Sequence, residues 1–410
     1  MSKHYPAAGI TALLAALTTC LAADPAPVGA WKIGTPVVTY WAGPPMTDAT
    51  AKQMAEGGFN LVWCSTEKEL DTAHRHRLRG LLTDGLLAPA TLDDPKRREQ
   101  LDTLIARVRQ HPALYTYHII DEPNAAQFPA LGRLVAYLRE RDPAHLAYIN
   151  LFPTYASNEQ LGTKGDVITA YREHLRLFVE QVKPALISYD HYQFELNGDK
   201  DQYFLNLALI RRAAQDAGLP FLNIVQACTW APEQMRIPNT NELRFLVFTT
   251  LAYGAPAISY YVYAHPGHHG SIANLDGTPG PLYHALKTYN REFVAIAKEL
   301  QPLRSLAVHH TALRERGCEP LPADAPFRLK QATSADHPRG LLLGSFGAKD
   351  KPSHVVVVNL DYTTSVNTVL VGPSELEIFD TKSGQWKPHR ASEAELNLLP
   401  GEGKLVRVRP

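Results

Sequence analysis

The chain has 410 residues, of which 41 are basic and 41 acidic, so its formal net charge is zero. A neutral chain has no general electrostatic attraction to nucleic acid or to an anionic membrane surface, and we expect neither as a partner. Because 45% of the residues are hydrophobic and 20% are charged, the chain can bury a core and is not intrinsically disordered. Four cysteines in this length exclude a disulfide-stabilised scaffold.

The first 23 residues have the features of a secretory signal. A basic start is followed by the apolar stretch Ile10–Ala16 and by small residues up to Ala23. This stretch is too short to span a bilayer, and no other segment approaches that length. We therefore predict a secreted or periplasmic protein that is cleaved after residue 22 or 23. Lipid attachment at Cys20 is an alternative, because residues 17–20 loosely resemble a lipobox.

From Trp31 to about Leu300, short apolar runs alternate with stretches of helical periodicity. The apolar runs are Thr35–Trp41, Phe59–Cys64, Leu78–Thr83, Leu114–Ile120, Leu146–Leu151, Leu186–Tyr189, Phe221–Val225 and Ala257–Val262. Eight strand–helix units in roughly 270 residues are typical of a (β/α)8 TIM barrel, which we predict over residues 24–301. A doubly wound sheet would need a glycine-rich phosphate turn after its first strand, and the turn here is Trp41-Ala-Gly-Pro-Pro.

After about Pro302 the pattern changes to short apolar runs separated by Gly, Asp, Pro and Ser. The runs are Gly340–Ser345, Ser353–Leu360, Thr368–Val371, Leu376–Phe379 and Lys404–Val408. They predict a small antiparallel β-sandwich domain over residues 302–410. We interpret this domain as structural, with a sugar-binding module as the alternative.

In such a barrel the catalytic groups lie at the carboxyl ends of the strands. The predicted strand ends carry acids, amides and aromatic residues but no lysine or arginine, which argues against a phosphate or carboxylate ligand. Tyrosine, the most frequent aromatic residue with 18 copies, combines an apolar ring with a polar hydroxyl. Together these groups indicate a site for a neutral, polyhydroxylated ligand, and we predict a carbohydrate substrate.

Glycoside cleavage needs one carboxylic acid to protonate the leaving oxygen and usually a second carboxylate as nucleophile or base. Glu122 ends the fourth predicted strand next to Asp121, and an apolar wall with a neighbouring charge would raise its pKa, as a general acid requires. The alternative is that this acidic pair only caps the following helix. Asp190, on the sixth strand, is the second candidate, either as a catalytic or as a binding carboxylate.

Further strand-end residues are predicted to bind the substrate. They are Trp41, Asp84, Asn150, His191, Tyr192, Gln226, Trp230 and Tyr261. The histidines His265, His268 and His269 lack the accompanying Cys or Asp spacing of a metal site. We therefore expect no metal and no cofactor.

The chain resembles the retaining (β/α)8 glycoside hydrolases of clan A and, more loosely, the family 42 β-galactosidases, and looks closest to secreted bacterial barrel hydrolases. The matching segments are Tyr117–Asn124, Tyr148–Pro153, Ser188–Tyr192, Leu251–Tyr261 and residues 276–283. The resemblance implies a galactosidase-like or endo-glycanase activity, with Glu122 as the acid.

The sequence departs from the clan A pattern at two strands. Asp121 stands where those enzymes carry Asn, and the seventh strand ends in Gln226 without a nucleophilic glutamate. The pair Asp121-Glu122 is similar to the dyad of the β-N-acetylhexosaminidases of families 20 and 123, in which the acetamido group of the substrate attacks. Two further alternatives stay open: inversion with Asp190 as base and a non-catalytic sugar-binding barrel. The sequence does not indicate an oligomeric state.

Overall fold

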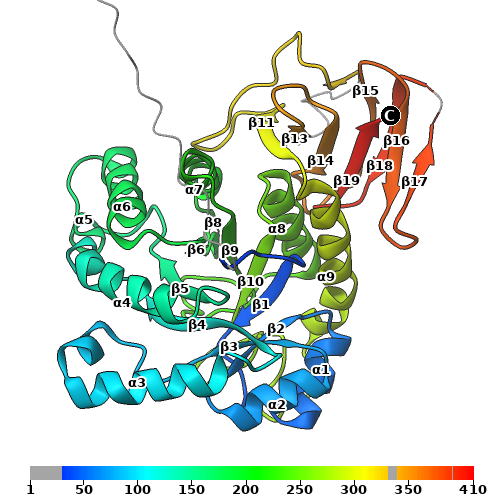
Figure 1. The fold of residues 1–410 in the computed structure, drawn as a ribbon. Helices are drawn as coiled ribbons and strands as arrows, with labels where there is room; N and C mark the ends of the chain where they lie inside the picture. Colours follow the sequence, from blue (N-terminus) through cyan, green and yellow to red (C-terminus); the bar gives the residue numbers. More distant parts are fainter. Residues whose placement is uncertain (1–29, 331–338, 390) are drawn as a thin grey trace, which may run out of the picture.

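The computed structural model describes residues 30–330, 339–389 and 391–410 (Figure 1). The predicted secretory signal and the alternative lipid site at Cys20 lie outside the described residues. No helix in the described ranges combines the length and the apolar character needed to cross a membrane.

Eight parallel strands form a nearly closed (β/α)8 TIM barrel, as the strand–helix period predicts. They are β1 (Val37–Trp41), β2 (Leu61–Cys64), β3 (Arg79–Leu82), β4 (Leu114–Asp121), β5 (Leu146–Leu151), β6 (Ile187–His191), β9 (Phe221–Gln226) and β10 (Ala257–Tyr261). The sheet runs from β1 through β10, β9, β6, β5, β4 and β3 to β2. Asn60, just before β2, closes the circle because its backbone N–H donates to the Val38 carbonyl of β1 at 3.0 Å.

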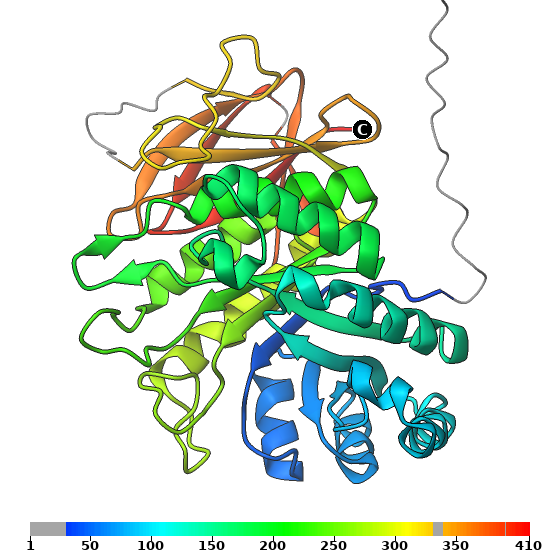
Figure 2. The same cartoon turned by 90° about the vertical axis from the view of Figure 1, so that its left-hand side faces the viewer.

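Helices follow the strands and cover the outside of the barrel (Figures 1 and 2). The main helices are α1 (Asp48–Glu56), α2 (Glu67–Arg75), α3 (Pro95–Val108), α4 (Phe128–Arg141), α6 (Val167–Val182), α7 (Tyr203–Ala217), α8 (Thr240–Ala252) and α9 (Pro281–Leu300). Short helical segments are α5 (Asn158–Leu161), η1 (Pro89–Asp93) and η2 (Ala125–Gln127). Helix α3 shows helical periodicity of its apolar residues, since Leu101, Leu104, Ile105 and Val108 form its buried face.

The interior of the barrel holds its own hydrophobic cluster, separate from the layer between strands and helices. Its members come from the strand segments around the whole barrel: Val37, Leu61, Leu81, Leu146, Tyr148, Leu186, Leu222, Ile224 and Ala257. Larger rings, including Trp41, Trp63 and Tyr261, pack against this cluster. The barrel is therefore filled with side chains, and ligands have access to its carboxyl-end mouth rather than to a channel.

The C-terminal region is built from antiparallel strands. Six strands form one sheet in the order β11 (Arg304–His310), β13 (Leu341–Gly347), β14 (His354–Asn359), β19 (Gly403–Val408), β16 (Leu376–Asp380) and β17 (Gln385–Pro388). Three more form a second sheet of β12 (Arg328–Leu329), β15 (Val366–Val371) and β18 (Glu393–Leu398). One apolar cluster contains residues of both sheets, such as Val357 and Leu396.

Helix α8 connects the two parts of the molecule. Ten of its thirteen residues are buried, from Glu242 to Ala252, because β9 lies on one side of the helix and β13 and β14 lie on the other. A side chain at Gly344 would meet the carbonyl of Ala252, so the helix and the sheet approach at backbone distance.

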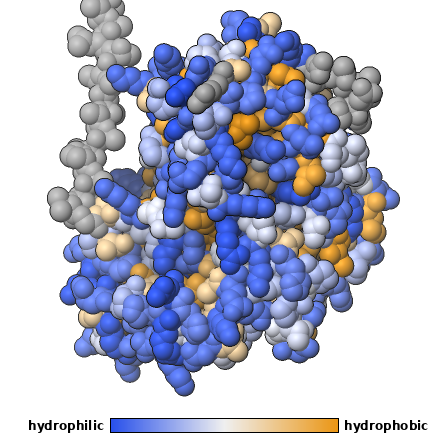
Figure 3. Space-filling model, turned by 90° about the vertical axis from the view of Figure 1, so that its right-hand side faces the viewer, coloured by the Kyte–Doolittle hydropathy of each residue, from blue (hydrophilic) through white to orange (hydrophobic). Residues whose placement is uncertain are grey.

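The outer face of the molecule shown in Figure 3 is mainly hydrophilic, with apolar side chains in scattered groups.

A small hairpin follows β6 at the barrel mouth. It consists of β7 (Phe194–Glu195) and β8 (Gly198–Asp199), which pair antiparallel. It lies between the last catalytic candidate, Asp190, and helix α7, so it forms part of the rim of the mouth.

Candidate active site

Three carboxyl groups and one amide meet at the carboxyl ends of β4, β5 and β6. The amide nitrogen of Asn150 donates to the carboxylates of Asp121 and Asp190, both at 3.0 Å. Glu122 joins the group because its carboxyl is hydrogen-bonded to that of Asp190. The predicted acids are thus brought together, although Asp190 is separated from the pair on β4 by more than sixty residues of sequence.

A directed chain of hydrogen bonds fixes the orientation of Asn150. The Ser188 hydroxyl donates to Asn150 Oδ1 at 2.9 Å, and the Tyr148 hydroxyl lies 2.8 Å from Ser188 Oγ. Because Ser188 uses its proton on Asn150, Tyr148 is the donor of the other bond. All three side chains are buried, so the amide must point its two N–H groups at the acids.

Glu122 occupies an unusual backbone conformation. Its φ of 44° lies in the left-handed region, which residues other than glycine seldom adopt. Its backbone N–H donates to the Asn150 carbonyl at 2.9 Å, which holds the residue in this conformation. A glutamate kept at a position that favours glycine indicates that its side chain, rather than its backbone, is required there.

The environment raises the pKa values of these acids. Burial, followed by the charge of Asp121, raises the pKa of Glu122 to about 7. Burial and the charge of Glu122 raise the pKa of Asp190 well above its usual range, against hydrogen bonds from Asn150 and Tyr192 that lower it. Two adjoining buried carboxyl groups cannot both be ionised at low cost, so Glu122 and Asp190 titrate as a pair.

Asp121 differs from its two neighbours in its access to solvent. Its side chain is exposed, yet the surrounding protein removes enough water to raise its pKa, with Asn150 acting in the opposite direction. Both observations are met at the wall of a concave mouth, where one side of a group is open and the other is not. Asp121 therefore lies on the solvent-facing side of the acidic group.

The alternative role of the acidic pair, capping the next helix, is filled by another residue. Asn124 caps η2, because its Oδ1 accepts from the Ala126 N–H at 2.9 Å and its own N–H donates to Gln127 Oε1 at 2.9 Å. Asp121 and Glu122 have no contact with that helix end among the described hydrogen bonds. The structure thus leaves both acids available to the mouth.

An aromatic floor lies beside the acids, formed by Trp41, Trp63, His118 and Tyr148. The ring of Trp41 is 5.1 Å from that of Trp63 and 5.5 Å from that of His118. Burial lowers the pKa of His118 to about 4, so this ring is neutral at physiological pH. Trp41 was predicted from the sequence, but Trp63 and His118 were not. The available signal was that every second residue of β2 and β4 faces inward, and Trp63 and His118 occupy such positions.

An aromatic wall is formed by Tyr192, Trp230, Tyr261 and His268, and it adjoins the floor because Tyr261 on β10 is paired with Trp41 on β1. The ring of Trp230 is 4.9 Å from those of Tyr192 and Tyr261. The Tyr261 hydroxyl is 3.1 Å from Nε2 of His268. Trp230 is 37% exposed, so its ring is available to a ligand. Apolar faces with nearby hydroxyls suit a ligand that is itself half apolar and half polar.

Two predicted substrate-binding residues do not reach the mouth. Gln226 is fully buried, with its Oε1 accepting from the Phe194 N–H at 2.8 Å and its Nε2 donating to the Arg236 carbonyl at 3.0 Å. His191 is also fully buried and lies 3.0 Å from Asn206 Oδ1. His191 points outward, on the same face of β6 as Ile187 and Tyr189. Gln226 has the inward register of Leu222 and Ile224 but is covered by the backbone of Phe194 and Arg236.

Asp84 occupies a separate hollow of about 420 Å³ beside His118. Its carboxylate accepts from the Leu86 N–H at 2.8 Å, which is ordinary turn chemistry. Tyr155, missed by the sequence analysis, lies on the loop after β5 and accepts from the Tyr192 N–H at 3.2 Å. The charges of Asp190 and Glu122 contribute to its raised pKa, after burial, so it lies close to these acids.

A hollow of about 790 Å³ lies at the opposite, amino-terminal end of the barrel. Its lining within the described residues contains no carboxylate, so it lacks the acid that glycoside cleavage needs. Within the same residues no three His, Cys, Asp or Glu side chains form a group suited to a metal ion. Lys200 lies over the Tyr155 ring near the mouth, but its charge is paired with Glu195 at 2.7 Å.

No protein-family model matches the chain, and no curated protein sequence does. Among solved structures, it is similar to a β-galactosidase from Marinomonas ef1 at 12% identity and a TM-score of 0.45, over 65% of this chain and 60% of that one. It is also similar to a monomeric β-xylosidase from Caulobacter crescentus CB15, at 10% identity and a TM-score of 0.46, over 93% of this chain and 97% of that one. A third similar structure is xylanase 10B from Thermotoga maritima, at 13% identity and a TM-score of 0.41, over 63% of this chain and 96% of that one. At these identities the similarity is one of fold alone.

Proposed function

We propose that this protein is a glycoside hydrolase that cleaves O-glycosidic bonds of a neutral oligo- or polysaccharide, with Glu122 as general acid. The observation that carries the proposal is the burial of Glu122 at the barrel mouth beside Asp121, which raises the pKa of Glu122 to about 7, whereas its hydrogen bond with Asp190 acts in the opposite direction. A glutamic acid that keeps its proton near neutral pH can protonate a leaving glycosidic oxygen. The aromatic floor and wall provide the apolar faces on which sugar rings would lie.

The contact between the two carboxyl groups also bears on the mechanism. Inversion needs a gap of about 6.5–9.5 Å to hold a water molecule, whereas retention uses about 5–5.5 Å. Hydrogen-bonded carboxyl groups are too close for an intervening water. The contact therefore argues against inversion with Asp190 as base, while retention with Asp190 as nucleophile requires the two carboxyl groups to move apart when the substrate binds.

Substrate-assisted cleavage is the second candidate, and the position of Asp121 favours it. This carboxylate is open to the mouth, adjoins Glu122 in sequence and is held by Asn150, so it can orient an acetamido group while Glu122 supplies the proton. Asp190, at 2% exposure, would then only adjust the pKa of Glu122. The two mechanisms differ in the substrate that they require.

The test uses 4-nitrophenyl glycosides with and without a 2-acetamido group, assayed with the wild-type protein and the variants Glu122→Gln, Asp190→Asn and Asp121→Asn. Loss of the general acid lowers turnover by about 10²–10⁴-fold. Glu99→Gln, on the exposed side of α3, is the control for a change of charge. Hydrolysis of acetamido substrates only, with greatest sensitivity to Asp121→Asn, would assign the substrate-assisted mechanism.

The proposal fails if Glu122→Gln retains wild-type turnover. Tight binding of an oligosaccharide by the wild-type protein, without any product after long incubation, would identify a non-catalytic sugar-binding barrel instead. We further propose that the two C-terminal sheets form a β-sandwich, because their strands share one apolar cluster.

A further inference from the structure

Three rim loops of the barrel mouth are joined by backbone hydrogen bonds. The N–H of Leu196 in the β7–β8 hairpin donates to the Gln234 carbonyl at 2.9 Å, in the loop after β9. Thr229, in the same loop, exchanges two backbone hydrogen bonds with His269 of the loop after β10, at 2.9 and 2.8 Å. These loops carry Tyr192, Trp230 and His268, three of the four rings of the aromatic wall, so the hydrogen bonds connect the wall to the rim.

The side chain of Gln226 strengthens this connection from below. It accepts from the backbone N–H of Phe194 and donates to the backbone carbonyl of Arg236, so one buried amide joins the hairpin to the loop after β9. A buried, fully hydrogen-bonded amide is costly to separate from its partners. The residue thus supports the wall, although it does not face the ligand.

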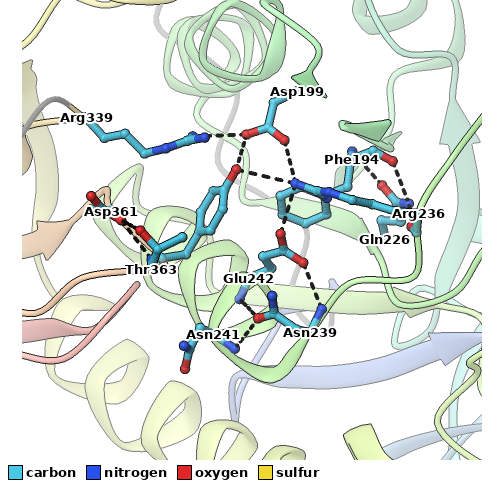
Figure 4. A network of polar contacts seen from close by, with 11 residues as sticks. Phe194, Asp199, Gln226, Arg236, Asn239, Asn241, Glu242, Arg339, Asp361 and Thr363 are labelled. Carbon is cyan, nitrogen blue, oxygen red and sulfur yellow. Dashed lines mark hydrogen bonds and ion pairs between the residues drawn. The ribbon is translucent and has the colours of Figure 1, made fainter. Parts of the chain in front are cut away.

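The C-terminal domain holds the outer end of the same hairpin through Asp199 (Figure 4). The carboxylate of Asp199 accepts from Arg339 Nη1 at 3.0 Å and from the Tyr362 hydroxyl at 2.5 Å, both in the C-terminal domain. Its other oxygen accepts from Arg236 Nη2 at 2.8 Å. Arg236 also pairs at 2.9 Å with Glu242, which forms the capping box of α8 with the N-cap residue Asn239.

These contacts form one cluster whose acids are buried, whereas the side chains of Arg236 and Arg339 are 26% and 37% exposed. The side chains of Asp199 and Glu242 are 9% and 6% exposed, and the two acids balance the charges of Arg236 and Arg339. The guanidinium groups also lie over aromatic rings, Arg236 over Phe194 at 4.5 Å and Arg339 over Tyr362 at 4.2 Å. Removal of one member leaves a buried charge without its partner, so the cluster resists displacement of any single group.

We propose that the C-terminal domain positions the aromatic wall of the active site, with Arg339 and Tyr362 as positioning residues that act through Asp199. The domain then affects substrate binding through the barrel rim and needs no sugar-binding surface of its own. The consequence for substrate rests on the proposed function, whereas the mechanical link between domain and rim does not.

Hydrogen exchange tests the link without any substrate. The variants are Arg339→Gln and the milder Tyr362→Phe, which removes one hydroxyl. Arg407→Gln is the matched control, because Arg407 also pairs with a carboxylate, Glu377 at 2.8 Å, and lies over a ring, Trp386 at 4.1 Å, inside the same domain. We expect the amides of residues 193–200 and 228–236 to exchange about tenfold faster in the first two variants and at the wild-type rate in the control.

The consequence for binding is measured with whichever 4-nitrophenyl glycoside the wild-type protein hydrolyses. A loosened wall should raise KM about three- to tenfold in Arg339→Gln and Tyr362→Phe while kcat changes little, because the acids on β4 and β6 stay in place. Unchanged exchange of both segments in folded variants, or equal acceleration in Arg407→Gln, would overturn the positioning role. If no glycoside is hydrolysed, the function proposed above fails while the exchange data still decide the link.

Discussion

The raised pKa of Glu122 means that the candidate active site destabilises the folded protein when this residue is charged. Glu122→Gln removes the charge but keeps the shape and the ability to hydrogen-bond Asp190. We therefore expect this variant to be inactive and, at alkaline pH, more stable than the wild type. Such an exchange of stability for function is common in active sites.

The size and sign of the effect follow from proton linkage. A pKa of about 7 in the folded state, against 4.5 ordinarily, corresponds to about 3 kcal/mol at 1.36 kcal/mol for each tenfold change in proton affinity. Water at the barrel mouth reduces this to about 1–2 kcal/mol. Because the folded state binds more protons than the unfolded one between these values, wild-type stability falls as pH rises from about 4.5 to 7 and stays reduced above.

Urea unfolding at pH 4.5 and pH 8 measures the effect. We expect Glu122→Gln to match the wild type at pH 4.5 and to exceed it by about 1–2 kcal/mol at pH 8. Glu99→Gln, which changes an exposed glutamate on α3, should show no such difference between the two pH values. Equal or lower stability of Glu122→Gln at pH 8 would refute the pKa argument and, with it, the assignment of the proton to this residue.

Three further predictions concern the same site. The kcat/KM of the wild type should fall as pH rises through about 7, because Glu122 must carry a proton; a profile that stays flat to pH 9 would contradict this. Asn150→Ala should lower kcat about 30-fold, since a lost hydrogen bond to a charged group is worth about 2 kcal/mol. An unchanged kcat would show that the hydrogen bonds from Asn150 to Asp121 and Asp190 are not needed for turnover. Trp230→Ala should raise KM about three- to tenfold with kcat and Tm unchanged, since its ring is exposed at the wall; a loss of kcat with KM intact would contradict a binding role.

The period of the apolar runs was sufficient to predict the barrel. Each of the eight predicted runs contains an observed strand or overlaps it closely, because every strand is buried on both faces and therefore reads as a continuous apolar segment. The clustering of Glu122, Asp121, Asp190 and Asn150 was predictable for a related reason. Parallel strands place all their carboxyl ends at one edge, so position along the strand is enough to bring distant residues together.

The direction of individual side chains was not predictable in the same way. Gln226 and His191 stand at strand ends like Asp190 but lie behind the site, while Trp63 and His118 lie in the floor without having been identified. A bulge between His118 and Ile120 shifts the register of β4 against β5, and no local pattern in the sequence marks it. Such a shift decides which of two adjacent residues faces the mouth.

The sequence by itself determined the barrel, the acidic and aromatic character of its mouth and the identity of the candidate acids, because these depend on periodicity and on residue type at strand ends. Only the tertiary structure decided that Glu122 and Asp190 share a hydrogen bond, that Asn124 caps the helix in place of the acids, and that Asp199 joins the rim to Arg339 and Tyr362. These three features join residues through burial and close contact, and pKa, capping and interdomain pairing depend on distances that chain order does not contain.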